Sequence, residues 1–140
     1  MARHDVPKHY LEWENAVLGV VRKNPLWKTI AYRKALFVYD LVWEDCDTLM
    51  KDMRGQAIAR QIIRSAGSIS ANMEEGFGHG LGRDYARILG IALGEARETQ
   101  GWYFRARRLL PATVIEHRLA LLDEVIALLV TIIDQQRKRK

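Results

Sequence analysis

The sequence predicts an all-α fold: an up-and-down antiparallel four-helix bundle with an additional short N-terminal helix. Apolar residues recur at spacings of three and four along the chain, and no alternating run is long enough to indicate a strand. The predicted long helices are joined by only about two to seven residues, so we expect neighbouring helices to be antiparallel. With 140 residues, the chain has the length of one domain.

The first predicted element is an N-terminal helical extension, residues 1–24. A capping aspartate and a proline in the first turn mark its start, and a short polar run ends it. Asn24 and Pro25 then form a cap and first-turn pair for a long helix, which we expect to continue to about Met53.

Three further helices complete the predicted bundle, residues 25–136. We expect Gly55 to separate the first long helix from the second, which ends where glycines crowd the segment 76–82. The next helix is predicted over residues 83–110. Pro111 ends that helix and opens the last one, because proline is tolerated in a first turn.

Cysteine content and hydropathy exclude several classes of protein. Cys46 is the single cysteine, so no intramolecular disulfide is possible, and a cytoplasmic protein is expected rather than a secreted disulfide scaffold. The most apolar stretch, Val125–Ile133, is far shorter than the roughly 20 residues of a membrane span, so no membrane association is expected.

The charge of the chain is unevenly distributed. The formal net charge is +5, and the basic tail, residues 137–140, contributes four of the positive charges. Within the remainder, segment 31–53 has an acidic excess and segment 81–110 a basic excess. Such a distribution suits self-association as well as binding to a polyanion.

Two of the predicted helices have a second apolar stripe that one bundle core does not need. A helix that is apolar on two sides is usually buried on two sides. Either the N-terminal helix covers one stripe, or the stripes form a subunit interface; we favour the interface, because one short helix cannot cover both. The candidate interface residues are Leu36, Trp43, Leu121, Val125, Leu128 and Ile132.

No catalytic or metal-binding constellation is evident. The chain has no Glu-x-x-His or CxxC motif, its four histidines are scattered, and its glycine run lacks the Lys-Ser/Thr of a phosphate-binding loop. Asp40, Glu44 and Asp47 share a helix face that is more typical of a solvated or partner-facing surface than of a cation site. Cys46 lies on an apolar stripe and is interpreted as a core residue. We therefore expect a non-enzymatic protein without a metal or cofactor.

The strongest local pattern is a polar stripe in the third predicted helix. Short amides and hydroxyls suit a partly buried hydrogen-bond network better than a solvated face. The arginine of the stripe then needs a carboxylate, either within the stripe or on the next helix. A network that sets the register of a helix or subunit contact is favoured over a site for a ligand or an RNA strand. The network residues are Gln61, Arg64, Ser68, Asn72, Glu75 and Glu98.

These residues also carry a resemblance. The string QIIRSAGSISANMEEGFG, from Gln61 to Gly78, followed by ALGEARE at 92–98, resembles the 23S rRNA intervening-sequence protein family of four-helix bundles. The resemblance spans roughly residues 31–133, with Met73 where the family usually has isoleucine. It implies a homo-oligomeric bundle, in relatives a pentameric ring around a central channel, without enzyme activity. Some members are encoded inside ribosomal RNA insertions, and distant relatives are basic proteins that bind nucleic acid beside a reverse transcriptase.

Nucleic-acid binding has its own candidate residues. Three arginines follow the aromatic run 102–104, which places cations next to stacking faces. Two functions remain open: a homo-oligomer that binds RNA or DNA through basic surfaces, or a structural or protein–protein ring with no nucleic-acid role. A continuous basic band would favour the first. The candidate residues are Arg105, Arg107, Arg108, Arg137, Lys138, Arg139 and Lys140.

Overall fold

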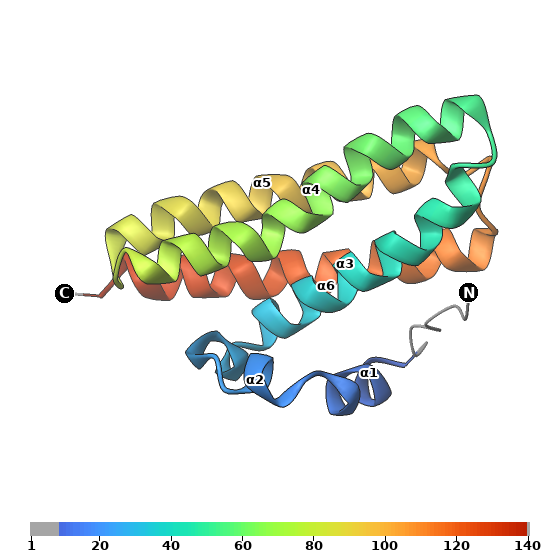
Figure 1. Ribbon diagram of the computed structural model, residues 1–140. Coiled ribbons are helices and arrows are strands. Elements are labelled where there is room, and N and C mark those ends of the chain that lie inside the picture. Colours follow the sequence, from blue (N-terminus) through green and yellow to red (C-terminus); the bar gives the residue numbers. More distant parts are fainter. Residues whose placement is uncertain (1–8, 140) are drawn as a thin grey trace.

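The computed structural model describes residues 9–139, and four long helices lying side by side form its body (Figure 1). None of the helices within this range is both long enough and apolar enough to traverse a membrane. The long helices are α3 (Ile30–Leu49), α4 (Met53–Gly78), α5 (Arg83–Arg105) and α6 (Ala112–Arg137). They are preceded by α1 (Tyr10–Ala16), α2 (Gly19–Arg22) and the 3-10 helix η1 (Pro25–Lys28).

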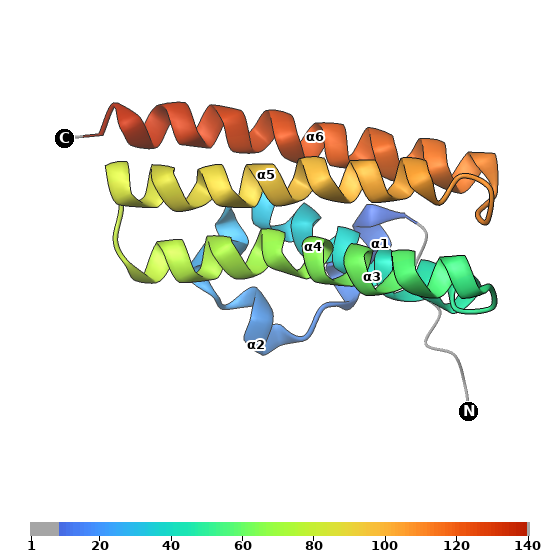
Figure 2. The same cartoon turned by 90° about the horizontal axis from the view of Figure 1, so that it is seen from above.

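Consecutive long helices run in opposite directions and pack against each other. α4 lies between α3 and α5, α5 packs on α6, and α6 closes the bundle against α3 (Figure 2). The predicted all-α, up-and-down bundle with an additional N-terminal helical segment is therefore confirmed for the described residues.

The helix predicted to run from residue 25 to about Met53 is interrupted. Asn24 does act as a cap, since its side-chain Oδ1 accepts a hydrogen bond from Leu26 N at 2.9 Å. However, it caps only η1, and the extended backbone of Thr29 separates η1 from α3. The prediction of one continuous helix was wrong because a capping pair indicates where a helix begins but not how far it extends.

Glycine placement also differs from the expectation. Gly55 lies inside the first turn of α4, and Asp52 caps that helix by accepting hydrogen bonds from Arg54 N and Gly55 N. α4 also continues through Gly76, where an added Cβ would lie 2.9 Å from a ring carbon of Tyr85. The chain turns only after Gly78, at Gly80 and Gly82, whose φ angles are positive. Glycine within a helix here permits close packing, whereas glycine between two helices permits the chain to reverse its direction.

The core is filled by apolar side chains from all four long helices. Among the polar contacts that cross it, Thr99 Oγ1 of α5 lies 2.9 Å from Ser65 Oγ of α4, and both residues are buried. Each hydroxyl also lies within hydrogen-bonding distance of a carbonyl oxygen of its own helix, so the one proton that each hydroxyl can donate has an acceptor inside the bundle. The largest fully buried side chains include Phe37, Leu49, Ile62, Ile69, Met73, Leu89, Tyr103, Leu122 and Leu129.

The N-terminal segment, here residues 9–28, packs on the outer side of α3. Trp13 is buried against Trp27 and against Phe37 of α3, with ring centroids 6.1 Å and 5.3 Å away. The Trp13 indole donates to Asp40 Oδ2 at 2.7 Å. An ion pair between Glu14 and Arg33 adds a second polar contact to the same helix. This aromatic cluster attaches the N-terminal segment to the bundle.

Candidate interaction surfaces

The described residues contain no group of three or more His, Cys, Asp or Glu side chains placed to hold a metal ion. Cys46 is half-buried, and its Sγ lies 3.9 Å from the carbonyl oxygen of Ala59. Burial, together with the charges of Asp45 and Asp47, raises the pKa of the Cys46 thiol to about 11. The thiol is therefore protonated at neutral pH and is not an activated nucleophile. The candidates for function described next are surfaces of the bundle.

The two predicted basic clusters lie at opposite ends of the bundle. Arg105, Arg107 and Arg108 are exposed at the connection from α5 to α6, whereas Arg137–Arg139 are exposed at the far end of α6 (Figure 1). Lys140 lies outside the described residues. The 26 residues of α6 separate the clusters by about 39 Å.

Arginines on the outer side of α5 connect these two ends. Arg83, Arg87, Arg97 and Arg105 are all exposed, and at about 100° per residue they fall within an arc of about 80°. We call these four residues the α5 arginine face. The basic tail adjoins the start of this face, because Gly82 N donates to the Gln136 side chain at 2.8 Å.

Three of the four members of the α5 arginine face were not among the sequence candidates. The signal was present as the basic excess of segment 81–110, but that excess does not reveal that the arginines share one exposed face. Arg87 pairs with Asp84 at 3.2 Å, while Arg83 and Arg97 have no ion-pair partner among residues 9–139. Arg83 and Arg97 therefore present positive charge to solvent without an ion-pair partner in the described part of the chain.

Arg105 belongs to a chain of contacts that crosses from α5 to α4. Its guanidinium carbon lies 4.8 Å from the centre of the Trp102 ring, and the Trp102 indole donates to Glu98 Oε2 at 2.9 Å. Glu98 also binds Arg64 of α4, which lies 3.5 Å from Glu95 as well. The predicted polar stripe and the predicted arginine–aromatic cluster thus form one continuous surface.

The polar stripe itself is more exposed than we predicted. The Arg64 side chain is 48% exposed, and Gln61 and Glu75 are exposed. Ser68 Oγ donates to the carbonyl of Arg64 at 2.9 Å, and Asn72 Nδ2 donates to the carbonyl of Ser68 at 2.7 Å. These two side chains bond to their own helix instead of bridging helices. Within one subunit, the partly buried network is therefore reduced to the contacts of Arg64 with Gln61, Glu95 and Glu98.

The predicted interface residues fall into two groups. Leu121 and Val125 are buried in the subunit core, so their assignment to a spare stripe on α6 was wrong. They are covered because the α3–α6 side of the bundle is closed by packing of α6 on α3, and Tyr10 of α1 also lies beside Leu121. Leu36, Leu128 and Ile132 are half-buried against the core. Trp43 alone among the six candidates is strongly exposed, at 63%.

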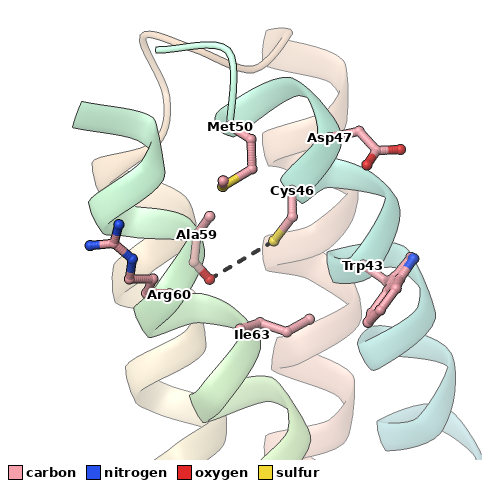
Figure 3. A pocket seen from close by; sticks show the side chains of 7 residues that line it. All are labelled: Trp43, Cys46, Asp47, Met50, Ala59, Arg60 and Ile63. Carbon is pink, nitrogen blue, oxygen red and sulfur yellow. Dashed lines mark hydrogen bonds between the residues drawn. The ribbon is translucent and has the colours of Figure 1, made fainter. Parts of the chain in front are cut away.

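Trp43 forms one wall of an apolar groove between α3 and α4, which we call the α3–α4 groove (Figure 3). Met50, which is 49% exposed, lies two turns further along the same wall, and Ala59 and Ile63 of α4 form the opposite wall. The hollow has a volume of about 260 Å³. Its full lining comprises Trp43, Cys46, Asp47, Met50, Ala59, Arg60 and Ile63.

The most buried ion pair was not predicted from the sequence. Arg118 of α6 binds both carboxylate oxygens of Asp45 of α3, at 2.8 Å and 3.1 Å, and Tyr103 of α5 donates to Asp45 Oδ2 at 2.6 Å. Asp45 follows Leu41 by four residues and precedes Leu49 by four, and both leucines are buried. That spacing placed Asp45 on the core side of α3 and was the signal available.

Comparison with known proteins identifies a family and a similar crystal structure. The profile of the family described as 23S rRNA-intervening sequence protein matches residues 28–131. A crystal structure of a protein of unknown function from the S23 ribosomal protein family of Bacteroides thetaiotaomicron is 28% identical, with a TM-score of 0.68. That match covers 74% of this chain and 97% of the other chain. No curated protein matches the chain.

Proposed function

Because the chain belongs to the 23S rRNA-intervening sequence protein family, we propose that it is a non-enzymatic homo-oligomer that binds RNA through its basic surfaces. The RNA-binding surface consists of the α5 arginine face, the α5–α6 connection and the basic tail. The assembly is a ring, with five subunits as in the relatives that the sequence resembles. A single cysteine with a protonated thiol is compatible with action in the reducing cytoplasm.

The row of four exposed arginines along α5 is the observation that supports RNA binding most strongly. A nucleic-acid backbone presents regularly spaced phosphates, and each one neutralised by arginine or lysine releases counterions. A line of arginines that runs the length of a helix and ends beside a basic tail matches such a charge distribution. In a ring the same line is repeated in every subunit, so weak contacts add through avidity.

Aromatic side chains beside the arginines favour single-stranded or looped RNA. Phe104 is 56% exposed, and the Arg107 guanidinium carbon lies 4.2 Å from its ring centre. Trp102 is half-buried beneath Arg105. Unpaired bases stack on aromatic rings and on guanidinium planes, whereas paired bases inside a duplex do not.

The test is a titration with single-stranded RNA over a series of salt concentrations. Truncation after Gln136 removes the tail, and R97Q/R105Q removes two charges of the α5 arginine face. Each lost phosphate contact should flatten the plot of log affinity against log salt by about 0.7, so the double variant should lose up to about 1.4 per subunit. K51Q/R54Q removes one charge from the α3–α4 connection and one from the first turn of α4, and should leave the slope unchanged. Equal slopes for all four proteins would contradict the proposal.

A structural or protein–protein ring remains the second candidate function. The observation in its favour is the α3–α4 groove, whose exposed Trp43 and Met50 suit a protein contact better than a phosphate backbone. If the protein has an oligomeric mass by light scattering but binds no RNA at low salt, this second function replaces the first. A monomeric mass would contradict both functions.

A further inference from the structure

The guanidinium group of Arg105, the last residue of α5, lies folded back over its own helix. Its carbon atom is 4.8 Å from the centre of the Trp102 ring. One of its nitrogens, Nη1, lies 2.8 Å from the place that a Cβ at Gly101 would take. Gly101 lies within a regular helix and has no positive φ angle, so the backbone itself does not require glycine there. The guanidinium instead uses the space that a side chain at position 101 would fill.

The Trp102 ring beneath this guanidinium is held in place. Its indole N–H donates to Glu98 Oε2 at 2.9 Å, and the ring is half-buried against the core. Glu98 is in turn bound by Arg64 of α4. Arg107 also lies over an aromatic ring, but that ring belongs to Phe104, which is 56% exposed and has no polar group to fix it. Of the two rings that support an arginine here, Trp102 is the more firmly held.

The donors of the Arg105 guanidinium are unused within the described subunit. Arg105 is exposed, and its side chain has no ion-pair or hydrogen-bond partner among residues 9–139. A guanidinium carries five N–H donors in one plane. Unpaired nucleobases stack on such planes, and the donors bind base edges and phosphates. The group therefore suits a planar ligand that brings hydrogen-bond acceptors with it, as an unpaired nucleobase does.

The position of Arg105 places it on the path of a strand bound along α5. It is the last member of the α5 arginine face, and Gly94 and Gly101 fall within the same arc of the helix. Arg97 lies about two turns before it, a rise of about 12 Å. A phosphate chain that follows the face from Arg83 therefore reaches Arg105 where α5 ends.

We propose that Arg105, held over Trp102, is a stacking site for an unpaired base of the bound RNA. The inference rests on the RNA binding of the proposed function and adds a contact with a base to the contacts with phosphates. Gly101 is a positioning residue, because the absence of a side chain leaves room for the guanidinium to lie over the indole. The protein should then prefer RNA with unpaired bases to a bare sugar–phosphate chain of equal charge.

Fluorescence anisotropy with two labelled probes tests the inference. One probe is a single-stranded oligoadenylate, and the other is an abasic sugar–phosphate chain of the same length, so both present the same number of phosphates. G101A keeps every charge of the protein but displaces the Arg105 guanidinium, which is the free end of a flexible side chain. G101A should therefore bind the oligoadenylate about fivefold or more weakly than the parent does. Its salt dependence and its affinity for the abasic chain should equal those of the parent.

Two further variants separate stacking from other effects. G94A adds the same methyl group on the same face of α5, where it meets no atom within 4 Å, and should bind both probes as the parent does. R105K keeps the charge but loses the guanidinium plane, so it should reproduce the weaker oligoadenylate binding of G101A. All three variants should keep the helical circular dichroism of the parent, since alanine favours a helix over glycine and Arg105 is exposed.

The remaining outcomes separate this inference from the proposed function. If the parent binds the oligoadenylate and either G101A or R105K binds it equally well, the stacking site is wrong while RNA binding through the arginines stands. An equal loss in G94A, or an equal loss with the abasic chain, would show an effect on the phosphate path and would also overturn the stacking site. If the parent binds neither probe at low salt, the proposed function is wrong and this inference fails with it.

Discussion

Asp45 and Arg64 show how strongly the surroundings of a charged side chain determine its energetic role. Both residues form ion pairs between helices. The side chains of Asp45 and Arg118 are only 8% and 15% exposed, whereas that of Arg64 is 48% exposed. An exposed pair contributes little because water screens the charges, but breaking a buried pair leaves a charge without compensation.

We therefore expect D45N to lower the free energy of unfolding much more than R64M does. D45N leaves the Arg118 guanidinium buried without its counter-charge and should lower the free energy of unfolding by about 3–5 kcal/mol. R64M should lower it by less than about 1 kcal/mol. Urea unfolding followed by circular dichroism measures both values. Small, similar losses would show that Asp45 is more hydrated than its burial indicates.

The buried side chain of Tyr103 should make the free energy of unfolding fall at alkaline pH. Burial first, and then the charge and hydrogen bond of Asp45, raise the pKa of Tyr103 well above its usual value of 10. Since the folded pKa lies above the unfolded one, the stabilisation is complete below about pH 10 and declines as the pH rises further. Y103F removes this titration, so its free energy of unfolding should fall less steeply between pH 9.5 and 11. Parallel curves for the two proteins would contradict the assignment.

At the scale of the helix, Gly55 fixes the approach of α4 to the end of α3. A Cβ at this position would lie 2.0 Å from the carbonyl oxygen of Leu49 and 3.0 Å from Leu109 Cδ1. Gly90, on the exposed side of α5, has no atom within 4 Å of an added Cβ. The two glycines thus differ in packing while both lie within helices.

Alanine substitution should separate these two roles. G55A should lower the free energy of unfolding by about 1–3 kcal/mol, because the backbone carbonyl of Leu49 must move. G90A should raise it by about 0.5–1 kcal/mol, since alanine has the higher helix propensity and meets no obstacle. Thermal unfolding of the two variants checks the signs, and a neutral G55A would show that the α3–α4 connection adapts freely.

The existence of the helices was predictable because apolar residues recur along them at regular spacings. The residues at which the helices begin and end were not predictable. The break at Thr29 and the continuation of α4 through Gly76 depend on tertiary contacts that no local pattern records. The same limit applies to the surfaces. Val125 looked like part of a spare stripe because the sequence does not say how wide an arc of α6 the bundle buries. Each arginine of α5 could be read from the sequence. That they share one exposed face could be recognised only once the helix and its position in the bundle were known.

For the whole molecule, the arrangement of the bundle separates two kinds of surface. α3, with the N-terminal segment on its outer side, packs between α4 and α6, and α5 packs between the same two helices (Figure 2). The α5 arginine face and the N-terminal segment are therefore on opposite sides of the subunit. RNA bound along α5 would leave the N-terminal segment uncovered.

The length of the α5 arginine face predicts how affinity depends on RNA length. α5 has 23 residues and spans about 35 Å, which corresponds to roughly ten stacked nucleotides at ~3.4 Å each. Affinity for single-stranded RNA should therefore rise most steeply up to about ten nucleotides. Fluorescence anisotropy with a graded series of oligonucleotides measures this dependence. If about four nucleotides already bind with full affinity, one end of the bundle is sufficient.

The attachment of the N-terminal segment also determines how the native state fluctuates. Its aromatic cluster packs mainly on α3, and α1 and α2 have only 7 and 4 residues, too few to persist as helices once detached. We therefore expect the segment to form a cooperative unit of its own, which opens while the four long helices stay folded. Its amide protons should then exchange with solvent at a rate set by that local opening, whereas those at the centres of α4 and α5 should exchange only when the whole bundle unfolds.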